Sequence, residues 1–132
     1  MAMTVKDIYE ATLRILAESL DEGDNADYEE RAPYLIAAFC TQTEDVDKAL
    51  RKSLGESSQM DFNSVYIALE DEFPLLDRFA PAAALYLASM FVMDDFEALS
   101  DRLYERYCDH ISKICDNIPT LNTSIVDKYG FR

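Results

Sequence analysis

The stretch that decides the fold is Phe79-Ala80-Pro81-Ala82-Ala83-Ala84-Leu85-Tyr86-Leu87-Ala88-Ser89-Met90-Phe91-Val92-Met93, which lies uncharged between Arg78 and Asp94. A membrane-spanning helix needs about 20 apolar residues, so this shorter run predicts a buried core helix. Pro81 suits the first helical turn, where its missing N–H group costs nothing. The residues over 82–93 are apolar nearly all round. A helix of that kind must be covered on most sides by the protein or by a partner.

The residues that follow form an amphipathic pattern. Apolar side chains recur at steps of three or four residues, at Phe96, Leu99, Leu103, Tyr107, Ile111, Ile114 and Ile118. This spacing predicts one long helix, which Pro119 ends. Segment 119–132 has no helical period, yet it keeps Leu121, Ile125, Val126, Tyr129 and Phe131. We expect a helical domain over 1–118 and an extended C-terminal tail over 119–132, which packs back on the domain or docks on a neighbour.

The N-terminal part of the chain predicts further helices. Thr4 is a good N-cap with Asp7 three residues later, as in a capping box, and a helix is expected over 5–20. A second helix is expected over 27–42, with Leu35, Ile36, Phe39 and Cys40 on its inward face. Its acidic first turn, which includes Glu29 and Glu30, suits the positive end of the helix dipole. Pro33 either starts the regular helix or bends it, because proline lacks the N–H group.

The middle of the chain is less regular. A short helix is expected over 44–54, stopped by Gly55 and followed by a polar loop over 55–61. Segment 62–72 could form a short strand or a helical turn, and we favour helix. The Phe73-Pro74 step favours an extended or turn conformation before the proline. The fold class predicted for the whole chain is all-α, a small bundle of about five helices with an extended tail.

Composition and charge limit the function. The chain has 132 residues, of which 49% are hydrophobic, and this favours a single globular domain. Only three glycines occur, so a loop-rich β-sandwich and a glycine-cradled nucleotide fold are both disfavoured. Lys and Arg number 12 against 26 Asp and Glu, a net charge of −14. Such a protein repels phosphate backbones and anionic membranes, whereas basic protein surfaces attract it.

No candidate catalytic, cofactor or metal site emerges from the residue pattern. Cys108, His110 and Cys115 are close in sequence, but a structural zinc site usually needs four ligands, and His110 points away from the face that the two cysteines share. We interpret Cys108 and Cys115 as core side chains. The acidic stretch over 21–30 lacks the glycine and glutamate positions of an EF-hand loop, so we interpret it as a solvated connection. The prediction is a protein that is not an enzyme.

The three cysteines also bear on location. Cys40, Cys108 and Cys115 cannot all pair within one chain, and no signal peptide is recognised at the N-terminus. Free thiols of this kind are typical of a reducing cytoplasm. We therefore expect synthesis in the cytoplasm.

Several stretches together resemble a known family. Asp71-Glu72-Phe73-Pro74-Leu75 leads into the alanine-rich stretch after Phe79, followed by Asp94-Asp95-Phe96-Glu97 and Leu103-Tyr104-Glu105-Arg106-Tyr107. This order is similar to that of the head–tail connector (adaptor) proteins of tailed bacteriophages and prophages. Glu29-Glu30-Arg31-Ala32-Pro33-Tyr34-Leu35-Ile36-Ala37-Ala38-Phe39 resembles an earlier core helix of that family. About half of the chain is covered, over 28–40 and 70–117.

The resemblance implies a small helical subunit that assembles as a homo-oligomeric ring beneath the portal protein and joins capsid to tail. It implies contacts with portal, connector and tail proteins, no cofactor, no membrane and no sequence-specific nucleic acid. The implied location is the bacterial cytoplasm during synthesis and the head–tail junction of the virion after assembly. We expect Ile125, Val126, Tyr129 and Phe131 to anchor docking of the tail. The alternative function is an acidic DNA mimic that inhibits a basic host or phage protein.

Overall fold

The computed structural model describes residues 3–17, 25–55 and 64–118. Within these ranges the chain forms four α-helices, α1 (Val5–Ala17), α2 (Asn25–Ser53), α3 (Ala80–Phe91) and α4 (Glu97–Asp116), and a short 3-10 helix, η1 (Asp77–Phe79). The described ranges contain no strand beyond one isolated bridge between Thr4 and Glu72. The all-α class is therefore confirmed, with four α-helices in these ranges where about five were expected.

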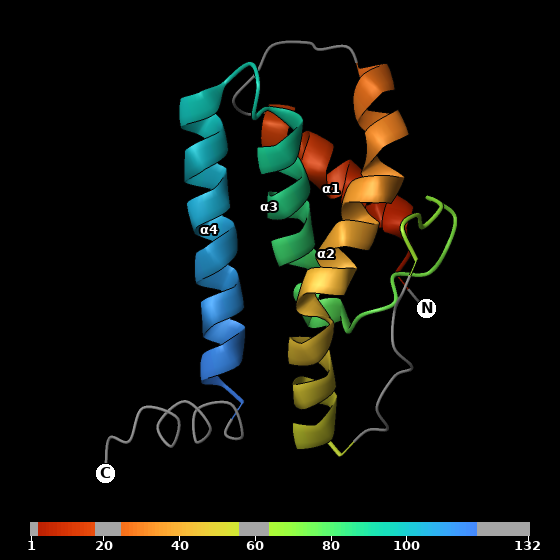
Figure 1. Cartoon of the computed structure of the whole chain (residues 1–132), viewed down its shortest axis with the longest axis vertical. Coiled ribbons are helices and arrows are strands. Elements are labelled where there is room, and N and C mark those ends of the chain that lie inside the picture. The colour runs from red at the N-terminus through yellow and green to blue at the C-terminus, as the bar shows by residue number, and fades with distance from the viewer. Residues whose placement is uncertain (1–2, 18–24, 56–63, 119–132) are drawn as a thin grey trace.

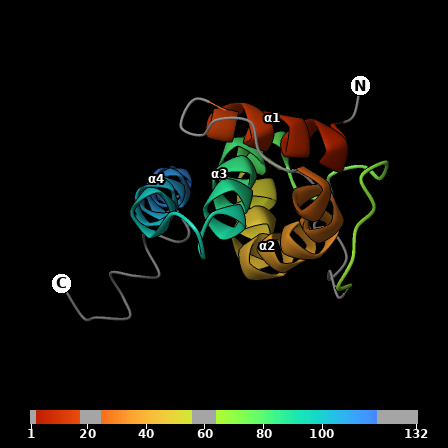
Figure 2. The ribbon, with the colours of Figure 1, turned by 90° about the horizontal axis from the view of Figure 1, so that it is seen from above.

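Helix α3 lies at the centre of the fold. The other helices are arranged around it, with α4 alongside on one side and α1 and α2 on the others (Figures 1 and 2). Ala82, Ala83 and Leu87 on α3 are 0% exposed. The prediction of a covered core helix is confirmed, although α3 ends at Phe91 rather than at residue 93. Pro81 lies in its first turn, where the missing N–H group has no intrahelical partner to lose.

Helix α2 corrects the expectation of two separate helices over 27–42 and 44–54. It runs without interruption from Asn25 to Ser53 and contains Pro33 in its interior. Thr43 is buried, and Thr41 donates a hydrogen bond back to the carbonyl of Ala37 at 3.1 Å, so no break occurs between the two segments. The ribbon bends within the half that holds Pro33 (Figure 1). A bend is expected there because the proline ring displaces the carbonyl one turn earlier.

Segment 64–72 is not helical, so the preference for helix was wrong over its described part. It runs in an extended path with one turn, and its carbonyls bind the N-terminus of α1. The Val5 N–H group donates to the Asp71 carbonyl and the Lys6 N–H group to the Leu69 carbonyl, both at 2.9 Å. Amides in the first turn of a helix have no hydrogen-bond partner inside the helix, and here the carbonyls of the segment accept them. The outer surface of this segment stays in solvent.

The capping box at the start of α1 is confirmed. The Thr4 N–H group donates to Asp7 Oδ2 at 3.0 Å, and the Asp7 N–H group donates to Thr4 Oγ1 at 3.3 Å. Helix α1 is regular up to Ala17, the last residue described before 25, so its predicted extension over 18–20 lies outside the described residues. The loop over 56–61 and the tail over 119–132 lie outside them too.

Hydrogen bonds from polar side chains join α3 to its neighbours. Thr12 Oγ1 on α1 donates to the Ala84 carbonyl at 3.3 Å, and Ser100 Oγ on α4 donates to the Ser89 carbonyl at 2.8 Å. Arg31 on α2 donates to the Met90 carbonyl at 3.0 Å, and its guanidinium lies 5.6 Å from the centre of the Phe91 ring. Each contact joins a backbone carbonyl of α3 to a side chain of a different helix.

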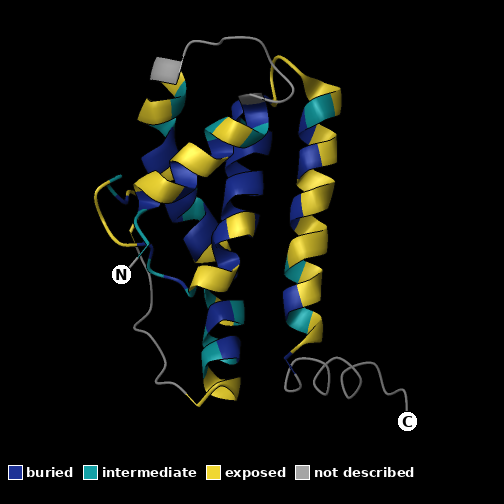
Figure 3. Ribbon diagram, turned by 180° about the vertical axis from the view of Figure 1, so that it is seen from behind, coloured by how far each residue is buried: buried dark blue, intermediate teal, exposed yellow. Residues whose placement is uncertain are grey.

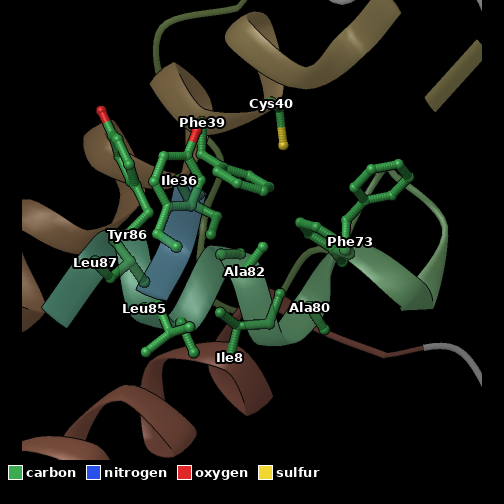
Figure 4. Close-up of a cluster of buried hydrophobic side chains, with 14 of the residues drawn as sticks. Ile8, Ile36, Phe39, Cys40, Phe73, Ala80, Ala82, Leu85, Tyr86 and Leu87 are labelled. Atoms are coloured by element: carbon green, nitrogen blue, oxygen red, sulfur yellow. The ribbon is translucent and has the colours of Figure 1, made fainter. Parts of the chain in front are cut away.

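An aromatic cluster fills the space between α2, α3 and α4. The Phe39 ring lies 5.8 Å from that of Tyr86 and 6.0 Å from that of Tyr107, measured between ring centres. Figure 4 shows Phe39 and Tyr86 side by side above α3, with Phe73 to one side. The Cys40 thiol lies at the edge of this cluster and is 0% exposed. Burial raises the pKa of Cys40 to about 12, so it stays a neutral thiol and packs as a small apolar group.

No helix within the described ranges has both the length and the apolar character needed to cross a membrane.

Candidate functional site

A groove opens between the N-terminus of α1, the first half of α2 and segment 64–70. Its volume is about 600 Å³. The lining residues are Lys6, Glu29, Glu30, Pro33, Tyr34, Tyr66, Leu69 and Glu70, and we call this site the acidic–aromatic groove. Figure 1 shows the light-green segment beside the orange half of α2, and these two elements supply most of the lining residues.

Two tyrosines form the aromatic part of the groove. Tyr34 is 56% exposed and Tyr66 is 48% exposed, and their ring centres are 5.1 Å apart in an edge-to-face arrangement. Val65, beside them in sequence, is 79% exposed. Two large rings therefore meet solvent at one place. Exposed apolar groups gathered in this way are typical of a surface that another molecule covers.

Backbone hydrogen bonds hold the loop tyrosine in place. The Ile67 N–H group donates to the Pro33 carbonyl at 3.2 Å, which attaches the loop to α2 immediately before Tyr34. Ser64 Oγ donates to the Tyr66 carbonyl at 2.8 Å, and the Tyr66 N–H group lies 3.3 Å from the same oxygen. The fold therefore holds the backbone that carries the two rings before any ligand arrives, which lowers the entropy cost of binding.

Charge determines what the groove can bind. Three glutamates and one lysine line it, which gives a local charge of −3 + 1 = −2. All three of Glu29, Glu30 and Glu70 are exposed. Carboxylates attract a cation, and a tyrosine ring face adds a cation–π attraction of about 0.5–1 kcal/mol at an exposed site. The arrangement suits a lysine or arginine side chain of a polypeptide, whose aliphatic part can lie on the rings.

The cysteine and histidine residues considered from the sequence as metal ligands or catalytic groups do not come together in one site. Cys108 is exposed and Cys115 is half-buried, so the interpretation of Cys108 as a core side chain is wrong. The reason is that α4 buries only one face, whose buried residues are Ser100, Leu103, Tyr107 and Ile114, and Cys108 is not among them. His110 is exposed as well. Among the described residues, no group of three or more His, Cys, Asp or Glu side chains could hold a metal ion. Ile125, Val126, Tyr129 and Phe131 lie outside the described residues.

The groove was not predicted from the sequence. Glu29 and Glu30 were assigned to the helix dipole, and Tyr34 had no predicted role. One signal was available, because Tyr34 lies off the inward face of its helix, on which Ile36, Phe39 and Cys40 are all 0% exposed. A tyrosine on the outer face of an acidic helix is a candidate contact residue. Its proximity to Tyr66 depends on the tertiary fold.

Comparison with protein-family profiles, with curated proteins and with solved structures finds no match to this chain. The described residues form a small all-α fold with an acidic surface groove.

Proposed function

We propose that this protein is a non-enzymatic adaptor that works by protein–protein contact, as its resemblance to phage head–tail connectors implies. In this role its subunits assemble beneath the portal protein and join capsid to tail. The observation that carries the proposal is the acidic–aromatic groove, in which two exposed tyrosines lie among three glutamates. A basic segment of the portal or of a neighbouring tail protein is the partner that this chemistry fits.

The overall charge supports the same role. A net charge of −14 steers basic protein surfaces toward the molecule and speeds encounter with them. It also repels the phosphate backbone, because non-specific DNA binding draws its free energy from cationic side chains that release counterions. A connector that surrounds a DNA channel benefits from both properties, since DNA must pass without being held.

Co-purification with a portal protein tests the proposal. A tagged portal protein encoded in the same genome is co-expressed with the chain, and the retained fraction and its Kd are measured. The triple variant Glu29→Gln/Glu30→Gln/Glu70→Gln is expected to bind at least about tenfold more weakly, equivalent to roughly 1.4 kcal/mol. Tyr34→Ala/Tyr66→Ala is expected to do the same without any change of charge.

The matched control removes three exposed carboxylates elsewhere. Asp101→Asn/Glu105→Gln/Asp109→Asn on α4 makes the same change of net charge and leaves the groove intact. Its Kd should stay within about twofold of the original. Equal weakening by both triple variants would show that overall charge, and not the groove, drives binding. Absence of any complex between the original chain and the portal would contradict the proposed function.

One observation favours the second candidate, an acidic DNA mimic. Four exposed carboxylates follow one another at four-residue steps along α4, at Glu97, Asp101, Glu105 and Asp109. Four residues of helix rise about 6 Å. One DNA strand carries a charge about every 3.4 Å, so the row is sparser than DNA, and Arg102 and Arg106 interrupt it. The adaptor is therefore the stronger proposal.

The two triple variants also separate these functions. A mimic would displace DNA from a basic DNA-binding protein in a competition assay, and the α4 variant would lose that ability. The groove variant would keep it. An adaptor gives the opposite result, because its loss of binding follows the groove.

A further inference from the structure

A second groove lies on another face, between α1 and α4 and over the first half of α3. Its volume is about 490 Å³. Ile8 and Ile15 from α1 and Ala84 and Leu85 from α3 contribute apolar lining, and Arg14, Arg106 and His110 contribute cationic or polar groups at its edges. We call it the α1–α4 groove. All three edge side chains are exposed.

The charge of this groove differs from that of the rest of the molecule. Its two arginines balance its two aspartates, Asp7 and Asp77, in a chain whose net charge is −14. Asp7 already accepts the Thr4 N–H group. Neither Arg14 nor Arg106 forms an ion pair with another residue of ranges 3–17, 25–55 and 64–118. The groove therefore offers two available guanidinium groups beside an apolar surface.

The complementary chemistry occurs on the same chain, in the turn between α3 and α4. Met93 is 51% exposed and Phe96 is 47% exposed, and Asp94, Asp95 and Glu97 around them are exposed too. Two backbone hydrogen bonds of Phe96 hold the turn in place. Its N–H group donates to the Val92 carbonyl at 2.8 Å, and its carbonyl accepts the Ser100 N–H group at 2.9 Å. Two apolar side chains thus project from a preformed turn ringed by three carboxylates.

We propose that the Met93–Glu97 turn of one copy docks in the α1–α4 groove of a second copy. Met93 and Phe96 lie against the apolar lining, and Asp94 and Asp95 pair with Arg14 and Arg106. The turn cannot reach the groove of its own chain. The lining of that groove extends along α3 only from Ala80 to Leu85, the turn follows Phe91, and the six-residue step from Leu85 to Phe91 rises about 9 Å.

The resulting contact is head-to-tail. Turn and groove are different surfaces, so each copy keeps one free groove and one free turn, and such contacts build a closed ring or an open filament. Figure 1 shows the turn at the upper end of α3. The start of α3, whose residues Ala80 and Pro81 line the groove, is at the lower end. The inference deepens the proposed function by naming the contact between neighbouring subunits. Its test uses the purified full chain alone, so its failure is distinguishable from failure to bind a portal.

Sedimentation equilibrium of the full chain is the first measurement. A contact centred on two side chains buries less surface than a standard interface, so we expect the average mass to rise between about 10 µM and 1 mM. The turn variant Asp94→Lys/Asp95→Lys and the groove variant Arg14→Glu/Arg106→Glu should each sediment as monomers over that range. Mixing the two should restore a complex, because the original turn of the groove variant fits the original groove of the turn variant, and the reversed turn faces the reversed groove.

A matched control reverses two exposed carboxylates that lie in neither surface. Glu10→Lys/Asp45→Lys changes the net charge as the turn variant does, and it should self-associate at least as well as the original chain. Met93→Ser/Phe96→Ser should also be monomeric, without any charge change. The proposal is overturned if the original chain stays monomeric up to about 1 mM. It is also overturned if the control variant is monomeric like the turn variant, or if the mixture of turn and groove variants stays monomeric. Each variant changes only exposed side chains, so circular dichroism should show an unaltered fold.

Discussion

Asp47 shows how one buried carboxylate fixes the connection before η1. It is 1% exposed, accepts the Leu76 N–H group at 2.9 Å and pairs with Arg51 Nε at 2.8 Å. Asp47→Ala leaves the amide and the guanidinium without this partner, so the free energy of unfolding should fall by about 3 kcal/mol. Urea denaturation of both proteins measures this difference in the free energy of unfolding. Asp45→Ala, an exposed neighbour on the same helix, should change stability by less than about 0.5 kcal/mol.

Tyr107 makes stability depend on alkaline pH. Burial raises its pKa from 10.0 to about 12, with smaller contributions from Tyr104, Tyr86 and Cys108, while a hydrogen bond to Thr43 acts in the opposite direction. The unfolded chain therefore loses this proton near pH 10, whereas the folded chain keeps it until about pH 12. The stabilisation is fully present below pH 10 and is lost as pH rises from 10 to 12.

Tyr107→Phe isolates this effect. The difference in unfolding free energy between the original chain and Tyr107→Phe should shrink as urea titrations move from pH 9 toward pH 11, on the order of 1 kcal/mol per pH unit above the unfolded pKa. Leu103→Ala, a buried non-titrating change on the same face of α4, should cost about 2–5 kcal/mol at every pH. A constant difference for Tyr107→Phe would show that its phenol titrates alike in both states.

At the scale of elements, the local sequence pattern was enough to predict a helix wherever the helix's own residues carried a cap or a regular apolar spacing. Thr4 with Asp7, the uncharged run after Phe79 and the apolar steps from Leu99 to Ile114 each predicted a helix that the structure contains. The sequence misled in two places, at the expected break between segments 27–42 and 44–54, where α2 continues, and in segment 64–72, which is not helical. In that segment the Leu69 and Asp71 carbonyls accept the amides of α1, and the Ile67 N–H group donates to the Pro33 carbonyl. Such distant hydrogen bonds leave no periodic signal.

The close packing of α3 is an element-scale property that substitution can measure. Ala88 on α3 is 0% exposed, whereas Ala98 on α4 is exposed. Ala88→Leu inserts three carbon atoms where no space exists, and it should lower the unfolding free energy by about 1–3 kcal/mol or more. Ala98→Leu adds the same atoms in solvent and should change it by less than about 0.5 kcal/mol. Thermal or urea unfolding followed by circular dichroism compares the pair.

At the scale of the whole molecule, buried and exposed residues are divided unevenly among the helices. Figure 3 shows α3 almost wholly buried, whereas α4 has one buried edge and a broad exposed surface. The sequence predicted this division, since α3 is uncharged and α4 is amphipathic. It could not predict the acidic–aromatic groove, because Tyr34 and Tyr66 are 32 positions apart and meet only through the path of segment 64–70. Binding surfaces assembled from distant segments are outside the reach of periodicity.

The net charge of −14 predicts opposite salt dependences for folding and for binding. Repulsion among surplus carboxylates destabilises the compact state, and salt screens it over a Debye length of about 8 Å at 0.15 M ionic strength. The melting temperature should therefore rise by several degrees, equivalent to roughly 1 kcal/mol, between about 10 mM and 300 mM salt. Attraction between the acidic–aromatic groove and a basic partner is screened by the same ions, so its association rate should fall over that range. Calorimetry measures the melting temperature, and stopped-flow binding in the same buffers measures the association rate. A melting temperature that falls with salt would mean that specific ion pairs outweigh the net repulsion.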